Sequence, residues 1–180
     1  MADQDLTLTT FFTEWQAYQD RLTASLKPLT TPQLALRAAP DLRCIGEIAL
    51  HIVGCRLFWF TGFLGEDGGE ELRPYARWNE VALGSPYASW DAVGLAMGTP
   101  TPTGVDLAQG LDRSWRLMAD RLARWSAADL RQTFPDGGDD GPIDVSRAWV
   151  VWHVLEHDLH HGGELSLALG MHGIPAEFAL

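Results

Sequence analysis

Histidine is unevenly distributed along this chain of 180 residues. Five of its six histidines follow Trp152, and the sixth, His51, lies alone in an apolar segment far upstream. Residues four positions apart on a helix share one face and lie about 6 Å apart along its axis. His157 and His161 have this spacing and could bind one metal ion together. His153 lies about 12 Å from His161 on the same face, which is too far for the same ion.

A three-histidine metal site therefore needs a ligand from a second helix. His51 is the candidate, although a lone histidine in an apolar helix is more often a hydrogen-bonded core residue. Two imidazoles from one helix and one from another would leave a coordination position open, as in catalytic rather than structural zinc sites. Three further side chains lie one helical turn from a candidate ligand, where they could orient the imidazoles or move protons: Glu47, His153 and Glu164.

Other interpretations of these residues remain open. Cys55 follows His51 by one turn and could be a fourth ligand or a reactive thiol, but a small buried hydrophobic residue is the commoner role. Asp158 creates an H-D-x-x-H variant of the metalloprotease H-E-x-x-H sequence, in which the acidic residue is the general base. Aspartate is shorter than glutamate, and nothing in the sequence indicates an edge strand to hold a peptide. His160 is expected near the mouth of the site, and His172 is expected to be exposed.

Four long helical patterns, and no convincing strand, are expected to position these residues. Apolar residues recur every three to four positions in each pattern, over about Leu6–Leu26, Ile45–Phe63, Val105–Trp125 and Val145–Leu169. A connection rich in glycine and proline runs from Gly65 to Pro102, with room for a short helix at Trp90–Met97. The segment 133–142 is expected to be a polar loop. The sequence thus predicts an all-α four-helix bundle with a long crossover between the second and third helices.

Length, charge and cysteine content narrow the class of protein. A length of 180 residues predicts a single domain spanning 1–180. The net charge of −11 and the pI near 4.8 argue against binding to nucleic acids or to anionic membranes. Cys44 and Cys55 would lie about 16 Å apart on one helix, too far for a disulfide. The acidic N-terminus also lacks the basic start of a signal peptide, so we expect a cytoplasmic protein.

Two segments of the chain resemble the DinB-like metalloprotein superfamily, which includes proteins of the YfiT type. The segment from Cys44 to Ile52 is similar to the family's second helix, where a histidine follows a start of the S-I-G-E kind. The segment from Trp152 to Leu165 is similar to the family's H-x3-H-x3-H-R-G-Q block. Three residues differ from the family pattern, in which serine, arginine and glutamine are usual: Cys44, Gly162 and Glu164.

The resemblance implies an up-down-down-up bundle that often forms homodimers. It implies a divalent ion, with zinc expected first and nickel or iron as alternatives, bound by His51, His157 and His161. It also implies a metal-dependent enzyme that transfers a low-molecular-weight thiol, such as bacillithiol, mycothiol or glutathione, to a small-molecule electrophile. A metal-assisted hydrolase and a non-catalytic, stress-associated metal-binding protein are the two alternatives. The apolar residues Trp152, Leu155 and Leu159, on the face of the fourth helix away from the histidines, favour the homodimer. The alternative is that the connection over 65–102 covers this face within one chain.

Overall fold

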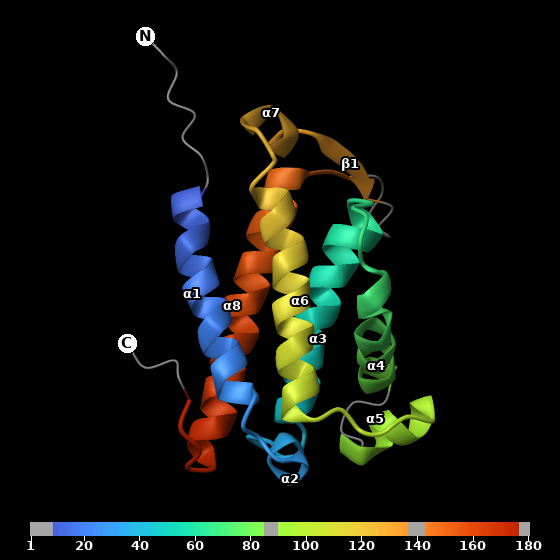
Figure 1. Ribbon diagram of the computed structural model, residues 1–180, viewed down its shortest axis with the longest axis vertical. Helices are drawn as coiled ribbons and strands as arrows, with labels where there is room; N and C mark the ends of the chain where they lie inside the picture. The colour runs from blue at the N-terminus through green and yellow to red at the C-terminus, as the bar shows by residue number, and fades with distance from the viewer. Residues whose placement is uncertain (1–8, 85–89, 137–142, 177–180) are drawn as a thin grey trace.

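Four long helices lie side by side in the computed structural model, which describes residues 9–84, 90–136 and 143–176 (Figure 1). They are α1 (Thr9–Leu26), α3 (Ile45–Leu57), α6 (Gly104–Leu122) and α8 (Arg147–Met171). Figure 1 shows α1 and α8 running in one direction and α3 and α6 running in the opposite direction. The connection from α3 to α6 crosses the length of the bundle. The expected all-α, up-down-down-up topology with a long crossover is therefore confirmed.

The crossover contains one helix that the sequence analysis missed. A π-helix, η1 (Phe58–Phe63), continues α3, and a 3-10 turn, η2 (Glu70–Leu72), leads into the missed helix α4 (Arg73–Gly84). Helix α5 (Trp90–Met97) lies where a short helix was expected. Pro74 stands in the first turn of α4, where a missing backbone N–H costs nothing. The buried face of α4 includes Tyr75, Asn79 and Ala82 and packs on α3, so tertiary contact stabilises this short helix.

The prediction that the chain has no strand was wrong. Strand β1 (Thr133–Asp136) lies in the segment expected to be a loop, and it pairs in antiparallel fashion with β2 (Ile143–Ser146), whose end overlaps the expected start of the fourth helix; Phe134 lies opposite Val145. Four residues are too few to show a clear alternation of apolar and polar side chains. Two single-turn helices complete the described elements, α2 (Thr31–Leu34) and α7 (Ala127–Leu130).

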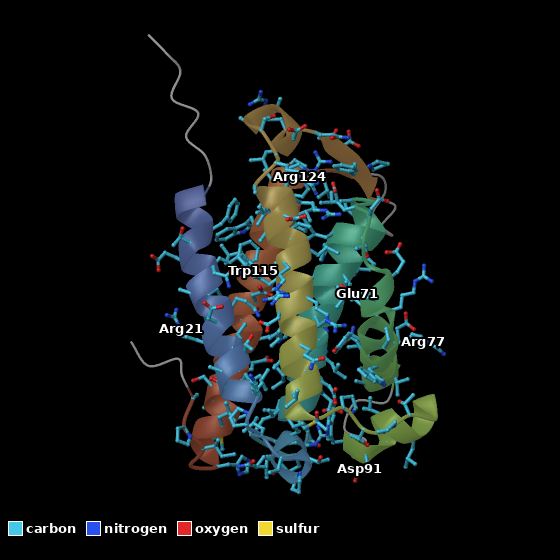
Figure 2. All side chains as sticks on the ribbon, viewed as in Figure 1. Arg21, Glu71, Arg77, Asp91, Trp115 and Arg124 are labelled. Carbon is cyan, nitrogen blue, oxygen red and sulfur yellow. The ribbon has the colours of Figure 1, made fainter. Side chains whose placement is uncertain are left out.

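Helix α3 lies at the centre of the fold. It packs against α4, α6 and α8, and every residue of α3 except His51 is buried. Its first turn is closed by Glu47, whose carboxylate accepts the backbone N–H of Cys44 at 2.6 Å and pairs with Arg37 at 2.8 Å. Charged side chains such as Arg77 and Arg124 project from the outside of the bundle, whereas Trp115 packs inside it against Trp15 (Figure 2).

A buried ion pair joins α3 to α8. Arg56 and Asp158 are both fully buried, and Nη2 of the arginine lies 2.8 Å from Oδ2 of the aspartate. The indole N–H of Trp15 donates to the same oxygen at 2.9 Å, and Arg56 also donates to the carbonyl of Leu111 and the hydroxyl of Ser114. Charges this deep are tolerated only when paired and hydrogen-bonded. No helix among the described residues is both long and apolar enough to cross a membrane.

Gly162 is required where α1 and α8 approach each other. A Cβ atom added at this glycine would lie 1.7 Å from the hydroxyl oxygen of Tyr18. That hydroxyl donates to the carbonyl oxygen of Asp158, at 3.2 Å. A larger side chain at this position has no room unless Tyr18 moves. At the next residue, Gly163, an added Cβ atom would meet no neighbouring group within 4 Å.

These two neighbouring glycines predict opposite effects of the same substitution. Gly162→Ala should lower the free energy of unfolding by about 1–3 kcal/mol, because Tyr18 must move to relieve the overlap. Gly163→Ala should raise it by up to about 1 kcal/mol, since alanine is the better helix former. Urea denaturation of both variants tests this expectation. A rise in the free energy of unfolding in both variants would show that helix propensity, and not the close approach, controls this part of α8.

Candidate metal centre

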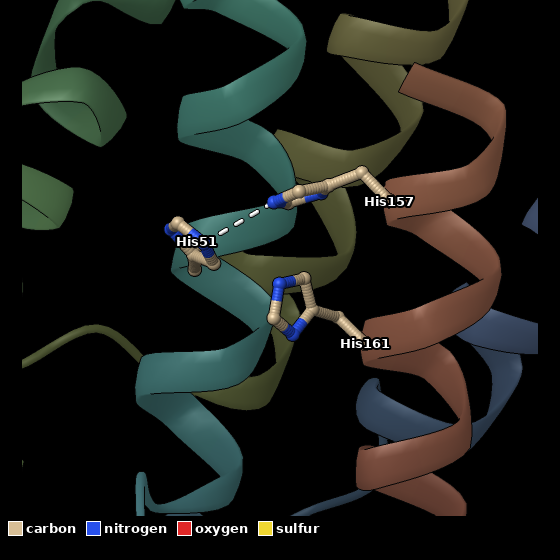
Figure 3. Close-up of side chains that lie close together, drawn as sticks. All are labelled: His51, His157 and His161. Carbon is tan, nitrogen blue, oxygen red and sulfur yellow. Dashed lines mark hydrogen bonds between the residues drawn. The ribbon is translucent and has the colours of Figure 1, made fainter. Parts of the chain in front are cut away.

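Helices α3 and α8 bring three histidines together, as Figure 3 shows. His157 and His161 lie one turn apart on α8, with ring centroids 4.3 Å apart. His51 faces them from α3, with its ring centroid 4.8 Å from that of His157 and 4.7 Å from that of His161. The Nε2 atoms of His51 and His157 are 3.2 Å apart. One potential ligand atom from each of the three residues lies within 4.8 Å of the other two.

The donor set fits a divalent metal ion. Zinc–nitrogen bonds of about 2.0–2.1 Å place nitrogens roughly 3.3 Å apart around a tetrahedral ion, close to the 3.2 Å between His51 and His157. Nδ1 of His161 lies 2.7 Å from a carboxylate oxygen of Glu164. This contact holds the proton on Nδ1 and leaves Nε2 with its lone pair facing the other two rings. The second oxygen of Glu164 lies 3.3 Å from His160.

All three imidazoles are held in the neutral form that a metal ion requires. Burial lowers the pKa of His51 to about 4, with further lowering from Arg43 and His161. Burial lowers the pKa of His157 to about 2, aided by the other histidines. The pKa of His161 is also lowered by burial, although its contact with Glu164 acts in the opposite direction. No proton therefore competes strongly with a cation near neutral pH.

The lowered pKa values predict that acid destabilises the metal-free protein. In the unfolded chain these histidines gain protons below their ordinary pKa of 6.5, whereas folded His51 gains one only near pH 4. The unfolded state therefore binds more protons between these values, and the free energy of unfolding falls as the pH drops through this range. Thermal unfolding in the presence of a chelator, at several pH values between about 4 and 6.5, measures this decrease in stability. His157→Gln should give a shallower decrease, and an equally steep one would assign the acid sensitivity to other groups.

The two candidate glutamates differ in their contacts with the three histidines. Glu164 contacts His161, as expected for a residue that orients a ligand. Glu47 was named as a side chain that could orient His51, but its carboxylate binds Cys44 and Arg37 at the start of α3. Among the described residues it forms no hydrogen bond with His51. It serves instead as an acceptor for the free N–H groups in the first turn of the helix.

His153 lies further from the metal centre than the three clustered histidines. Its ring centroid is 6.3 Å from that of His157, and it stacks on Trp149 with the two rings 4.8 Å apart and 7° from parallel. His172 is exposed, as expected, with Nε2 2.8 Å from the carbonyl of Arg37. Asp158 points into the core, so the H-D-x-x-H arrangement serves packing here and supplies no base to the histidines.

A cavity of about 500 Å³ opens beside His51 and His157. Its walls come from α3, η1, α4 and α8, and its main lining residues are Leu57, Phe58, Trp59, Asn79, Leu83 and His153. We call it the aromatic cavity. Cys55 also lines it, and burial raises the pKa of this thiol to about 12, so the thiol stays protonated and matches the commoner role as a buried hydrophobic residue.

A second, smaller cavity lies beside Glu164. It measures about 380 Å³ and is lined by the charged residues Asp41 and Arg43 among others. Leu83 lines both cavities, and Glu164, which contacts His161, lines only the second. Neither Asn79 nor Leu83 was predicted from the sequence, because both belong to α4, which was not among the expected helices.

Comparisons with known proteins agree with the fold. The family model of the DinB superfamily matches residues 14–165, so the chain belongs to the DinB superfamily. A crystal structure of a DinB-like protein from Bacillus cereus ATCC 10987 is 18% identical, with a TM-score of 0.68, and the match covers 98% of this chain and 100% of that one. A conserved protein from Enterococcus faecalis is 14% identical, with a TM-score of 0.66, and the match covers 92% and 99%. No match was found among curated proteins.

Proposed function

We propose that the protein is a metal-dependent enzyme that joins a low-molecular-weight thiol to a small-molecule electrophile. The observation that supports this most is the convergence of His51, His157 and His161 beside a cavity of about 500 Å³. Three histidine ligands leave room for substrate at the ion, and zinc is the proposed metal, with nickel or iron as alternatives. When bound, the ion supplies Lewis acidity that lowers the pKa of a coordinated thiol or water.

The chain's own groups would position and deprotonate the thiol. Glu164 keeps Nε2 of His161 free to bind the ion by holding the proton on Nδ1. His153 lines the aromatic cavity and is the proposed acceptor of the thiol proton. The sulfur then forms a bond to an electrophilic carbon, and the leaving group departs with the electron pair of the bond that breaks. In this scheme His153 acts on the proton and contributes little to metal affinity.

Conjugation of thiols to 1-chloro-2,4-dinitrobenzene tests the proposed function. Zinc-loaded protein should accelerate the reaction of at least one of bacillithiol, mycothiol, glutathione and cysteine, and a chelator should abolish the acceleration. His161→Ala should be inactive, whereas His153→Ala should retain zinc but react more slowly. If no thiol reacts and none changes the spectrum of the cobalt-substituted protein, a metal-assisted hydrolase or a non-catalytic site becomes the better interpretation.

We further propose that the protein forms a homodimer through α8. Trp152 is 60% exposed and Leu159 is 48% exposed, and both lie on the helix face away from the histidines. Burying such side chains against a second copy would remove apolar surface from water. Sedimentation at micromolar concentration should give twice the 19.9 kDa chain mass, and Trp152→Glu should shift the protein to the monomer. A wild-type protein that sediments at the chain mass would contradict the dimer.

A further inference from the structure

The aromatic cavity has a wall that is fixed before any ligand arrives. Trp59 of η1 lies near-perpendicular to His153 and Trp149 of α8, with ring centroids 5.0 and 5.4 Å away. On its own side Trp59 meets Phe58 and Phe63, at 5.2 and 5.0 Å. These edge-to-face arrangements are the favoured geometry of aromatic pairs. Four rings already hold the side chain of Trp59 in place. A flat ligand ring can therefore pack on Trp59 at little cost in side-chain entropy.

Asn79 adds one polar group to this apolar space. It is only 9% exposed, and its Oδ1 atom is buried. Its amide nitrogen packs against α3 at Gly54, where an added Cβ would lie 2.2 Å from Nδ2. The side chain of Asn79 also has a hydrogen-bonding interaction with His51 that raises the pKa of His51. A carbonyl oxygen carries two lone pairs, so Oδ1 can accept a hydrogen bond from a ligand next to the metal centre.

The size and charge of the aromatic cavity restrict what can enter. A volume of about 500 Å³ falls within the range of roughly 300–1,000 Å³ typical of small-molecule sites. Among the described residues that line it there is no arginine or lysine, and the acidic side chain there is Glu80. Without the metal ion, a carboxylate or phosphate would lose its hydration there without gaining a cationic partner from the described lining residues. The lining therefore favours an uncharged ligand.

We propose that the aromatic cavity binds a neutral, planar aromatic substrate whose hydroxyl or amino group donates a hydrogen bond to Oδ1 of Asn79. The ring packs on Trp59, and the substrate's reactive carbon faces His51 and His157. This assignment rests on the proposed function in one respect, because it makes the aromatic molecule the electrophile that receives the thiol. The ligand class itself follows from the walls of the aromatic cavity and does not depend on turnover.

Calorimetric titration of the full-length protein, kept free of metal by a chelator so that no ion can pair with a carboxylate, tests the ligand class with four probes. The neutral probe 2-naphthol should bind with a stoichiometry of one per chain. The anion 2-naphthoate should bind at least about tenfold more weakly, because its charge is buried without a partner. Decahydro-2-naphthol, which keeps the hydroxyl but is not flat, should bind at least about fivefold more weakly. 2-Methoxynaphthalene, which has no hydrogen-bond donor, should bind about fivefold more weakly than 2-naphthol.

Three variants locate the binding. Gly62 lines the aromatic cavity, and a Cβ atom there meets nothing within 4 Å, so Gly62→Phe should narrow the cavity without disturbing the fold. It should weaken 2-naphthol binding at least about tenfold. The matched control is Gly170→Phe. Gly170 is also an open position, but it lies on α8 and does not line the cavity, so this variant should bind 2-naphthol as tightly as the wild type. Asn79→Leu should weaken 2-naphthol about fivefold but leave 2-methoxynaphthalene unchanged, because only the first donates to Oδ1.

The outcomes separate this inference from the proposed function. Binding of 2-naphthol that is lost in Gly62→Phe and persists without zinc supports the inference, even if no thiol is ever transferred. Thiol transfer without selective naphthol binding would support the proposed function and overturn the inference. A dissociation constant for 2-naphthol weaker than about 1 mM, an equal affinity for 2-naphthoate, or full binding by Gly62→Phe would each overturn it.

Discussion

His157→Ala should weaken zinc binding by more than about 100-fold. Loss of a group that merely orients a ligating histidine costs roughly 10- to 100-fold, and removal of the ligand itself should cost more. His157 contributes a ring nitrogen 3.2 Å from that of His51, so its removal takes away one of the three clustered donors. Competition with a chelating dye at neutral pH measures the affinity.

His172→Ala is the matched control for this experiment. His172 is exposed beyond the end of α8, and its ring contacts the backbone of Arg37, so its loss should leave zinc affinity unchanged. His51→Ala should behave like His157→Ala. Wild-type affinity in His51→Ala would show that α3 supplies no ligand and would leave only the pair on α8.

Asp158→Ala should lower the free energy of unfolding by about 3–5 kcal/mol, because it leaves Arg56 charged, buried and without its carboxylate. The indole N–H of Trp15 also loses its acceptor. The transition in urea should move to much lower concentration, or the variant should be unfolded without denaturant. Ion pairs on the surface contribute far less, so Asp120→Ala, which removes the exposed partner of Arg124, should change stability by only about 0–1 kcal/mol.

The milder variant Asp158→Asn separates a structural role from a catalytic one. It keeps an acceptor for Trp15 but removes the negative charge beside Arg56. Zinc affinity of the folded fraction should equal that of the wild type, since Asp158 points away from the histidines and into the core. A fall in zinc affinity at unchanged stability would restore Asp158 to the metal centre.

The candidate ligands could be predicted from the sequence because helix geometry alone limits them. Spacing of four residues placed His157 and His161 on one face, and the distance from His153 excluded it from the same ion. His51 was then the remaining histidine in an apolar helix. The order of the four long helices followed from apolar spacing in the same way, and the resemblance to the DinB superfamily supplied their directions.

Contacts between elements distant in sequence could not be predicted in this way. The role of Glu47 depends on Arg37, which approaches from outside the helix, and the role of Gly162 depends on Tyr18 of α1. The aromatic cavity is closed partly by α4, whose buried face includes Asn79, a residue that no apolar pattern reveals. Such features arise from packing, so periodicity in one segment carries no signal of them.

The most direct test of the metal centre is the X-ray absorption spectrum of the zinc-loaded protein. Ligation by His51, His157 and His161 predicts a first shell of nitrogen and oxygen only, at about 2.0–2.1 Å, with the outer-shell scattering of three imidazole rings. A sulfur neighbour at about 2.3 Å would implicate Cys55 and contradict the three-histidine site. A first shell with fewer than three imidazoles would contradict it equally.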